Sequence, residues 1–145
     1  MKRFSQIICI VLVLATVLGT TAFAAGPTEP RGSNYFWSSS VYFWHVSGSQ
    51  YQIWFDVTAK SVMQKLGASQ IAVERSTDLV NWEPAGTYYM SSNSQMVGSN
   101  TGSYANYITY YPTSGYAYRA IVTLYAKNSS GYGEMDEVTA TLDLR

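Results

Sequence analysis

The fold is decided by an eight-residue stretch that reads Tyr51-Gln52-Ile53-Trp54-Phe55-Asp56-Val57-Thr58. Its core-forming apolar residues recur at every second position, and a period of two is typical of a β-strand with one buried face. We expect the four odd-numbered residues to face the core. Trp54 lies on the opposite face, between Gln52 and Asp56, and we expect that face to meet solvent.

The same period of two recurs further along the chain, in residues 69–76, 116–127 and 138–144. Six turn segments rich in Gly, Ser, Asn, Asp or Pro interrupt the pattern. This spacing predicts an all-β fold class, a single antiparallel β-sandwich of about seven strands. We expect one helical turn at Met63–Leu66, and either a mobile or a ligand-binding loop at Ser91–Gly102.

The N-terminal 25 residues have the pattern of a helical signal peptide. Lys2 and Arg3 precede an apolar run, Ile7–Leu18, and Ala22-Phe23-Ala24 offers the small residues that a signal peptidase needs. The run is too short to be a stable membrane anchor, and no anchoring segment is expected at the other end. We therefore predict cleavage near Ala24 or Ala25 and an extracellular, secreted protein.

The predicted division of the chain is a signal peptide at 1–25, a flexible leader at 26–33 and a β-sandwich domain at 34–145. The leader is polar and contains two prolines. Cys9 is the only cysteine and lies inside the signal peptide, so we expect the mature chain to fold without a disulfide. About 120 residues suffice for one packed core, and we expect a monomer.

Charge and composition narrow the range of partners. Beyond Ala25 the chain carries seven Lys or Arg and nine Asp or Glu residues, with no basic cluster. This balance argues against nucleic acid as a partner. The aromatic content stands out instead, with 13 Tyr, 4 Trp and 5 Phe in the whole chain.

Two stretches carry a resemblance to known proteins. Ser76–Glu83 resembles a hairpin of extracellular β-domains, in which we expect Ser76 and Asp78 to accept hydrogen bonds from turn amides and Trp82 to cover the turn. Similar strings occur in five-bladed glycosidase propellers and in sialidase Asp boxes, but this chain has no internal repeat with which to build a propeller. Tyr116–Gly131 is similar to a strand and turn of fibronectin type III domains.

Together with Met63–Ser69, these stretches resemble a family of small secreted proteins of Gram-positive, clostridia-like bacteria. The resemblance spans about residues 31–144. It implies a fibronectin type III or immunoglobulin-like sandwich and an extracellular location. The family has no assigned activity, so the resemblance implies no functional residues.

No catalytic, metal or cofactor site is expected. His45 is the only histidine, and it has no cysteine or second histidine with which to bind zinc or form a catalytic triad. The acidic residues Glu134, Asp136 and Glu137 lack the glycine-centred loop of a calcium site. The chain has the carboxylates that a glycosidase would need, but no sequence motif indicates that they are catalytic.

The aromatic side chains make the strongest functional argument. Trp54 is the first candidate for contact with a ligand, followed by Trp44 and Trp37, because exposed rings can stack on sugars while nearby amides and hydroxyls bind sugar hydroxyl groups. The structural alternative is that these rings form cross-strand pairs that stabilise the sheet by about 0.2–1 kcal/mol each.

The predicted function is a non-catalytic binding module, acting at or outside the cell surface on a cell-wall glycan, a host glycan or a surface protein. One alternative is a secreted effector, such as a bacteriocin-like or signalling protein. A cryptic carbohydrate-active enzyme ranks third.

Overall fold

The computed structural model describes residues 33–145, so the predicted signal peptide and the leader up to residue 32 lie outside the described residues. In this range the fold is all-β, with six antiparallel strands and one short 3-10 helix, η1 (Ser94–Met96). The strands are β1 (Phe36–Ser47), β2 (Gln50–Ser76), β3 (Glu83–Tyr89), β4 (Val97–Tyr110), β5 (Ala117–Lys127) and β6 (Gly133–Asp143). Residues 33–145 contain no helix that is long and apolar enough to cross a membrane.

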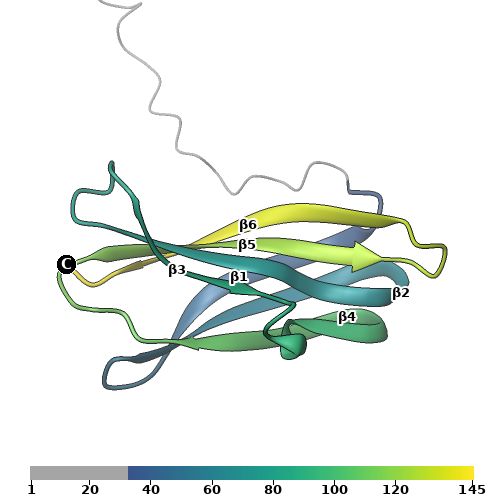
Figure 1. Cartoon of the computed structure of the whole chain (residues 1–145), viewed down its shortest axis with the longest axis horizontal. Helices are drawn as coiled ribbons and strands as arrows, with labels where there is room; N and C mark the ends of the chain where they lie inside the picture. The colour runs from purple at the N-terminus through teal and green to yellow at the C-terminus, as the bar shows by residue number, and fades with distance from the viewer. Residues whose placement is uncertain (1–32) are drawn as a thin grey trace, which may run out of the picture. The chain divides into compact units, whose positions relative to one another are not determined.

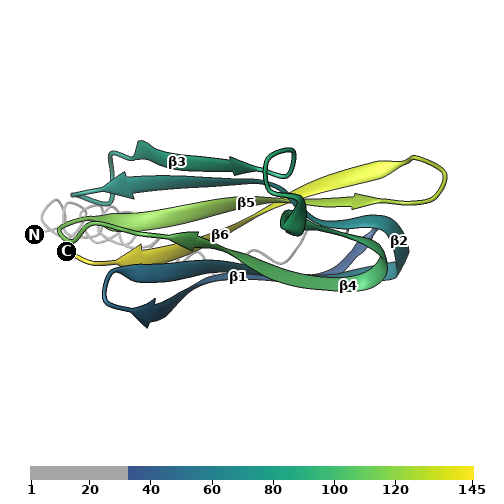
Figure 2. The same ribbon diagram turned by 60° about the horizontal axis from the view of Figure 1, so that its bottom comes forward.

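The 27-residue strand β2 organises the whole sheet. Its first half, Gln50–Thr58, pairs with β1 on one edge and with β4 on the other. Its second half pairs with β3 and β5, and β6 extends the sheet beyond β5. The sheet therefore curls (Figure 1). In the view of Figure 2, β3 lies on one side and β1 and β4 lie on the other.

β2 changes its neighbouring strands at Lys65–Gly67, a segment that pairs with both β4 and β5. Gly67 has a φ of 156°, and a Cβ atom there would lie 2.1 Å from the carbonyl oxygen of Met96. That separation is far below van der Waals contact. Glycine is therefore required where η1 packs against the bend of β2.

Two local predictions are wrong. Met63–Leu66 is part of β2 rather than a helical turn, because Met63 and Leu66 are buried and the segment bonds to neighbouring strands. The turn signal at residues 65–67 consequently ends no strand, and there are six strands instead of about seven. The predicted loop at Ser91–Gly102 is also shorter, because η1 and the start of β4 occupy residues 94–102.

The core lies between the two halves of the curled sheet. Ile53, Phe55 and Val57 are fully buried, as the alternation of residues 51–58 predicts, while Tyr51 at the end of the strand is half-buried. From the second half and β5 the cluster includes Ile71, Val73, Tyr118, Ala120, Val122, Leu124 and Ala126. Burial of these side chains supplies the main stabilisation of the fold.

Tyr118 ties the core to the loop that precedes β5. Its ring is buried, and its hydroxyl donates to the carbonyl oxygen of Thr113 at 3.0 Å. The same hydroxyl oxygen accepts the backbone N–H of Thr113 at 2.8 Å. Both hydrogen-bonding functions of the phenol are thereby satisfied inside the protein.

Candidate functional site: an aromatic row on the outer face

Three aromatic side chains lie next to one another across β1, β2 and β4. The strand register places Tyr42 opposite Trp54, and Trp54 opposite Tyr107. The ring centroids of Tyr42 and Trp54 are 6.4 Å apart with nearly parallel planes, and those of Trp54 and Tyr107 are 4.7 Å apart. We call Tyr42, Trp54 and Tyr107 the aromatic row.

The central ring of the aromatic row is held firmly, while the outer two are open to solvent. Trp54 is half-buried, and its indole N–H donates to Oε1 of Gln52 at 2.9 Å. Tyr42 and Tyr107 are exposed by 44% and 37%. The row thus combines a fixed centre with accessible flanks, an arrangement that limits the entropy lost when a ligand binds.

Polar and aromatic side chains border the row. Trp44, which follows Tyr42 by two positions on the same face of β1, is 59% exposed and pairs in register with Gln52. Gln52 in turn pairs with Thr109 of β4. Beyond the row in the other direction lies Asp56. The outer face therefore has an amide (Gln52), a hydroxyl (Thr109) and a carboxylate (Asp56) two positions along the strands from the aromatic row.

Trp37 lies apart from the aromatic row. It is 73% exposed and occupies the irregularity of β1 between Phe36 and Ser38. Five residues of extended chain, about 16 Å, separate it from Tyr42. Of the three predicted ligand-binding tryptophans, the structure places Trp54 and Trp44 together and Trp37 elsewhere.

Sequence reasoning missed Tyr42 and Tyr107 as members of the site. Each follows the alternation of its own strand, which is a signal that it shares a face with other outward residues. The register that brings them to Trp54 depends on pairings between distant segments. That register is set by the fold as a whole and is not visible in either local sequence.

The second half of the sheet carries a different outer face. Nε of Arg119 lies 2.5 Å from Oε2 of Glu74, and the guanidinium carbon lies 4.5 Å from the centre of the Trp82 ring. The indole N–H of Trp82 donates to the carbonyl oxygen of Leu79 at 3.2 Å. Trp82 is thus covered by a cation and bonded to the turn beside it.

The turn that follows β2 is tied down by Ser76 and Asp78. Oγ of Ser76 accepts the N–H groups of Asp78 and Leu79, and Oδ1 of Asp78 accepts those of Val80 and Asn81. The amide groups of Asn81, followed by the N–H of Val80 and the hydroxyl of Ser76, hold the pKa of Asp78 well below its usual value. These bonds support Leu79, whose φ is 64°.

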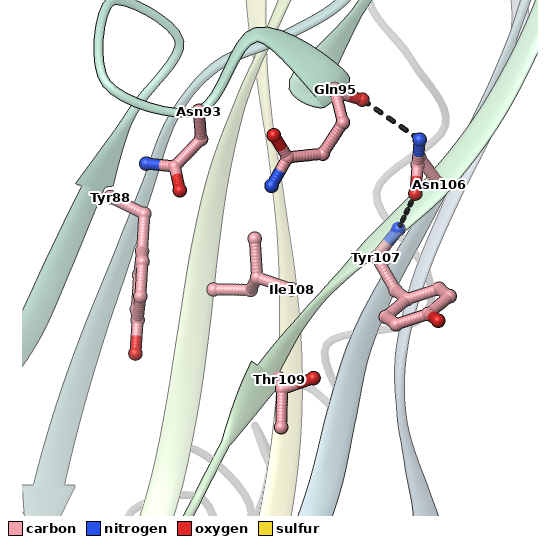
Figure 3. A pocket seen from close by; sticks show the side chains of 7 residues that line it. All are labelled: Tyr88, Asn93, Gln95, Asn106, Tyr107, Ile108 and Thr109. Carbon is pink, nitrogen blue, oxygen red and sulfur yellow. Dashed lines mark hydrogen bonds between the residues drawn. The ribbon is translucent and has the colours of Figure 1, made fainter.

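A hollow of about 400 Å³ lies beside the aromatic row, between β3 and β4 and next to η1 (Figure 3). Its lining consists of Tyr88, Asn93, Gln95, Asn106, Tyr107, Ile108 and Thr109. Tyr107 belongs to both features. No charged side chain lines the hollow.

Within residues 33–145, no group of three or more His, Cys, Asp or Glu side chains is arranged to hold a metal ion. His45 is exposed at the end of β1, with Nε2 3.0 Å from the carbonyl oxygen of Gly48. The side chain of Glu134, in the acidic group considered above, lies outside the part of the chain that the structure describes.

Comparison of this chain with protein-family models, curated proteins and solved structures gives no match. The aromatic row and the hollow beside it are two surface features of residues 33–145 that could bind a ligand.

Proposed function

We propose that this protein is a secreted, non-catalytic binding module that holds a glycan against the aromatic row. The observation that carries the proposal is the alignment of Tyr42, Trp54 and Tyr107 on one outer face, with Trp44 exposed beside them. Large exposed aromatic groups gathered on one surface mark interaction sites. Here they lie on paired strands, which keep their spacing fixed.

The chemistry around the row suits a sugar. The C–H faces of a sugar ring are apolar and stack on aromatic rings, while its hydroxyl groups need donors and acceptors nearby. Gln52, Asp56 and Thr109 supply such groups on the same face. A purely apolar partner would leave these groups without hydrogen bonds, at a cost of about 1–3 kcal/mol for each buried one.

The proposal includes an extracellular location and a β-sandwich architecture. The location is supported by the signal-peptide pattern of the first 25 residues. The sandwich is supported by the bend of β2 and by Tyr118, whose hydroxyl bonds to the backbone of Thr113. A tyrosine near the start of a strand with such a bond a few residues upstream is typical of immunoglobulin-like sandwiches.

The proposal can be tested by measuring binding to a glycan array that includes bacterial cell-wall and host glycans. We expect Trp44→Ala to weaken binding about tenfold or more, because it removes an exposed ring beside the aromatic row. Trp37→Ala is the matched control, since it removes another exposed tryptophan of the same strand at a distant position. Both side chains are mostly exposed and lie outside the core cluster, so both melting temperatures should stay near that of the wild type.

Absence of binding to every glycan on the array would contradict the proposal. Equal losses in Trp44→Ala and Trp37→Ala would contradict the assignment of the site to the aromatic row.

A further inference from the structure

The hollow beside β4 contains two groups of polar side chains with different roles. Asn106 is fully engaged: its Nδ2 donates to the carbonyl oxygen of Gln95 at 2.9 Å, and its Oδ1 accepts the N–H of Tyr107 at 2.8 Å. The hydroxyl of Tyr104 donates to the same carbonyl oxygen of Gln95 at 2.6 Å. These bonds fix η1 and the adjoining loop above the hollow. The hollow is therefore preformed before any ligand binds.

Other polar groups of the hollow have no protein partner among residues 33–145. They are the side-chain amide of Gln95, the Oδ1 atom of Asn93, the hydroxyl of Tyr88 and the hydroxyl of Thr109. Figure 3 shows Tyr88 on the side of β3, the side chains of Asn93 and Gln95 at one end, and Ile108 between the two strands. Ile108 is 4% exposed and gives the hollow an apolar floor.

This lining favours an uncharged, polyhydroxylated ligand. Small-molecule sites are commonly about 300–1,000 Å³ in volume and place a few convergent polar groups around an apolar surface. A charged ligand would find no counter-ion in the lining. The Tyr88 phenol is a neutral donor and acceptor at physiological pH, and burial raises its pKa further from that range.

The open edge of β4 is poorly suited to an added strand at this point. A strand of another chain would pair with free backbone N–H groups. The N–H of Tyr107 is already bonded to the side chain of Asn106. A small ligand held by side chains fits this edge better than backbone pairing does.

Tyr107 connects the hollow to the aromatic row. Its ring stands next to Trp54, and the residue also lines the hollow. We propose that the hollow is a second subsite, which takes one neutral sugar residue of the glycan whose neighbouring residues lie on the aromatic row. This inference rests on the proposed function and adds to it the ligand's charge class and a second point of contact.

The test measures dissociation constants by calorimetry for soluble hexasaccharides of glucose, xylose, mannose and N-acetylglucosamine, and for polygalacturonate as an acidic probe. We expect at least one neutral hexasaccharide to bind, and Gln95→Ala and Tyr88→Phe each to weaken it about five- to tenfold, since each removes one hydrogen bond. Gln64→Ala, at an exposed glutamine of β2 outside the hollow, is the matched control and should leave affinity unchanged. Gln95→Ala keeps the backbone carbonyl that holds η1 in place.

The outcomes separate the two proposals. If Trp44→Ala weakens binding while Gln95→Ala and Tyr88→Phe do not, the second subsite is wrong and the aromatic row stands. If polygalacturonate binds more tightly than every neutral hexasaccharide, the charge class is wrong. If no saccharide binds to the wild-type protein, both the proposed function and the second subsite fall.

Discussion

Each half of β2 has a half-buried tryptophan, Trp54 within the first half and Trp82 just after the second, and the surroundings of the two rings differ. Trp54 in the first half stands between two tyrosines, and its row carries no basic side chain. Trp82, beside the second half, lies under the guanidinium group of Arg119, which also pairs with Glu74. Two tryptophans with similar exposure can therefore differ in their capacity to bind a ligand. A ring whose face is covered by a neighbouring side chain, as Trp82 is by Arg119, is not free to stack on a ligand.

The largest loss of stability is expected at the junction between the two halves of β2. Gly67→Ala would place a methyl group 2.1 Å from the carbonyl oxygen of Met96 and force an alanine into a φ of 156°. We expect a loss of about 3 kcal/mol or more in the free energy of unfolding, from overpacking and backbone strain together. Urea denaturation followed by tryptophan fluorescence would measure it.

Gly48→Ala is the control for this substitution. Gly48 also has a positive φ, 53°, but nothing lies within 4 Å of its missing Cβ atom. We expect it to cost only about 1 kcal/mol. Equal losses at the two glycines would show that β2 does not bend against η1 as described.

Arg119→Met removes the cation that lies over the Trp82 ring. The substitution removes the ion pair with Glu74 and the cation over the indole ring, and we expect it to lower the free energy of unfolding by about 1–2 kcal/mol. It should also make Trp82 more accessible to acrylamide, measured as stronger fluorescence quenching in a Trp37→Phe, Trp44→Phe background.

Lys127→Met serves as the control, because it replaces a cation at the far end of the same strand, away from Trp82. Unchanged quenching in Arg119→Met would contradict the view that Arg119 covers the ring.

The smallest expected effect concerns the turn beside Trp82. The pKa of Asp78 is lowered in the folded protein, so its contribution to stability is present above the unfolded pKa and is lost as the pH falls through the folded value. Asp78→Asn keeps one oxygen acceptor but loses the charge. We therefore expect a slightly lower melting temperature than the wild type at pH 7, and a difference that begins to narrow below about pH 4, as the unfolded carboxylate takes up its proton.

Melting curves between pH 7 and pH 2 would measure this difference. Thr77→Ala, an exposed neighbour in the same turn, should show a pH-independent difference from the wild type. A difference between Asp78→Asn and the wild type that is the same at pH 7 and pH 2 would contradict the assigned role of the carboxylate.

Much of the architecture was accessible from local sequence, because a period of two directly reports a strand with one buried face. Ile53, Phe55 and Val57 are buried, as their alternation predicts. Met63–Leu66 misled for a physical reason. Its residues form helices readily in isolation, but neighbouring strands bond to this segment, and tertiary contacts override such weak preferences.

The site was accessible in part. The outward position of Trp54 followed from the same alternation, although its ring is half-buried by its neighbours. Tyr42 and Tyr107 meet Trp54 only through the register of three strands, and the hollow requires β3, η1 and β4 to come together. Contacts between segments so far apart in the chain cannot be predicted from the local sequence of any one of them.

The length of β2 has a consequence for how this protein folds. Four of the other five strands bond to it, and its second half can pair with β5 only after a long intervening segment has been brought back. Closing such loops before their contacts form makes folding slow compared with that of helical proteins. β4 bonds to residues 51–58 and also to Met63 and residues 65–67 of β2, so opening the first half would disturb the start of the second. We therefore expect backbone amides at the centre of β2 to exchange with solvent only through global unfolding, in a single cooperative transition.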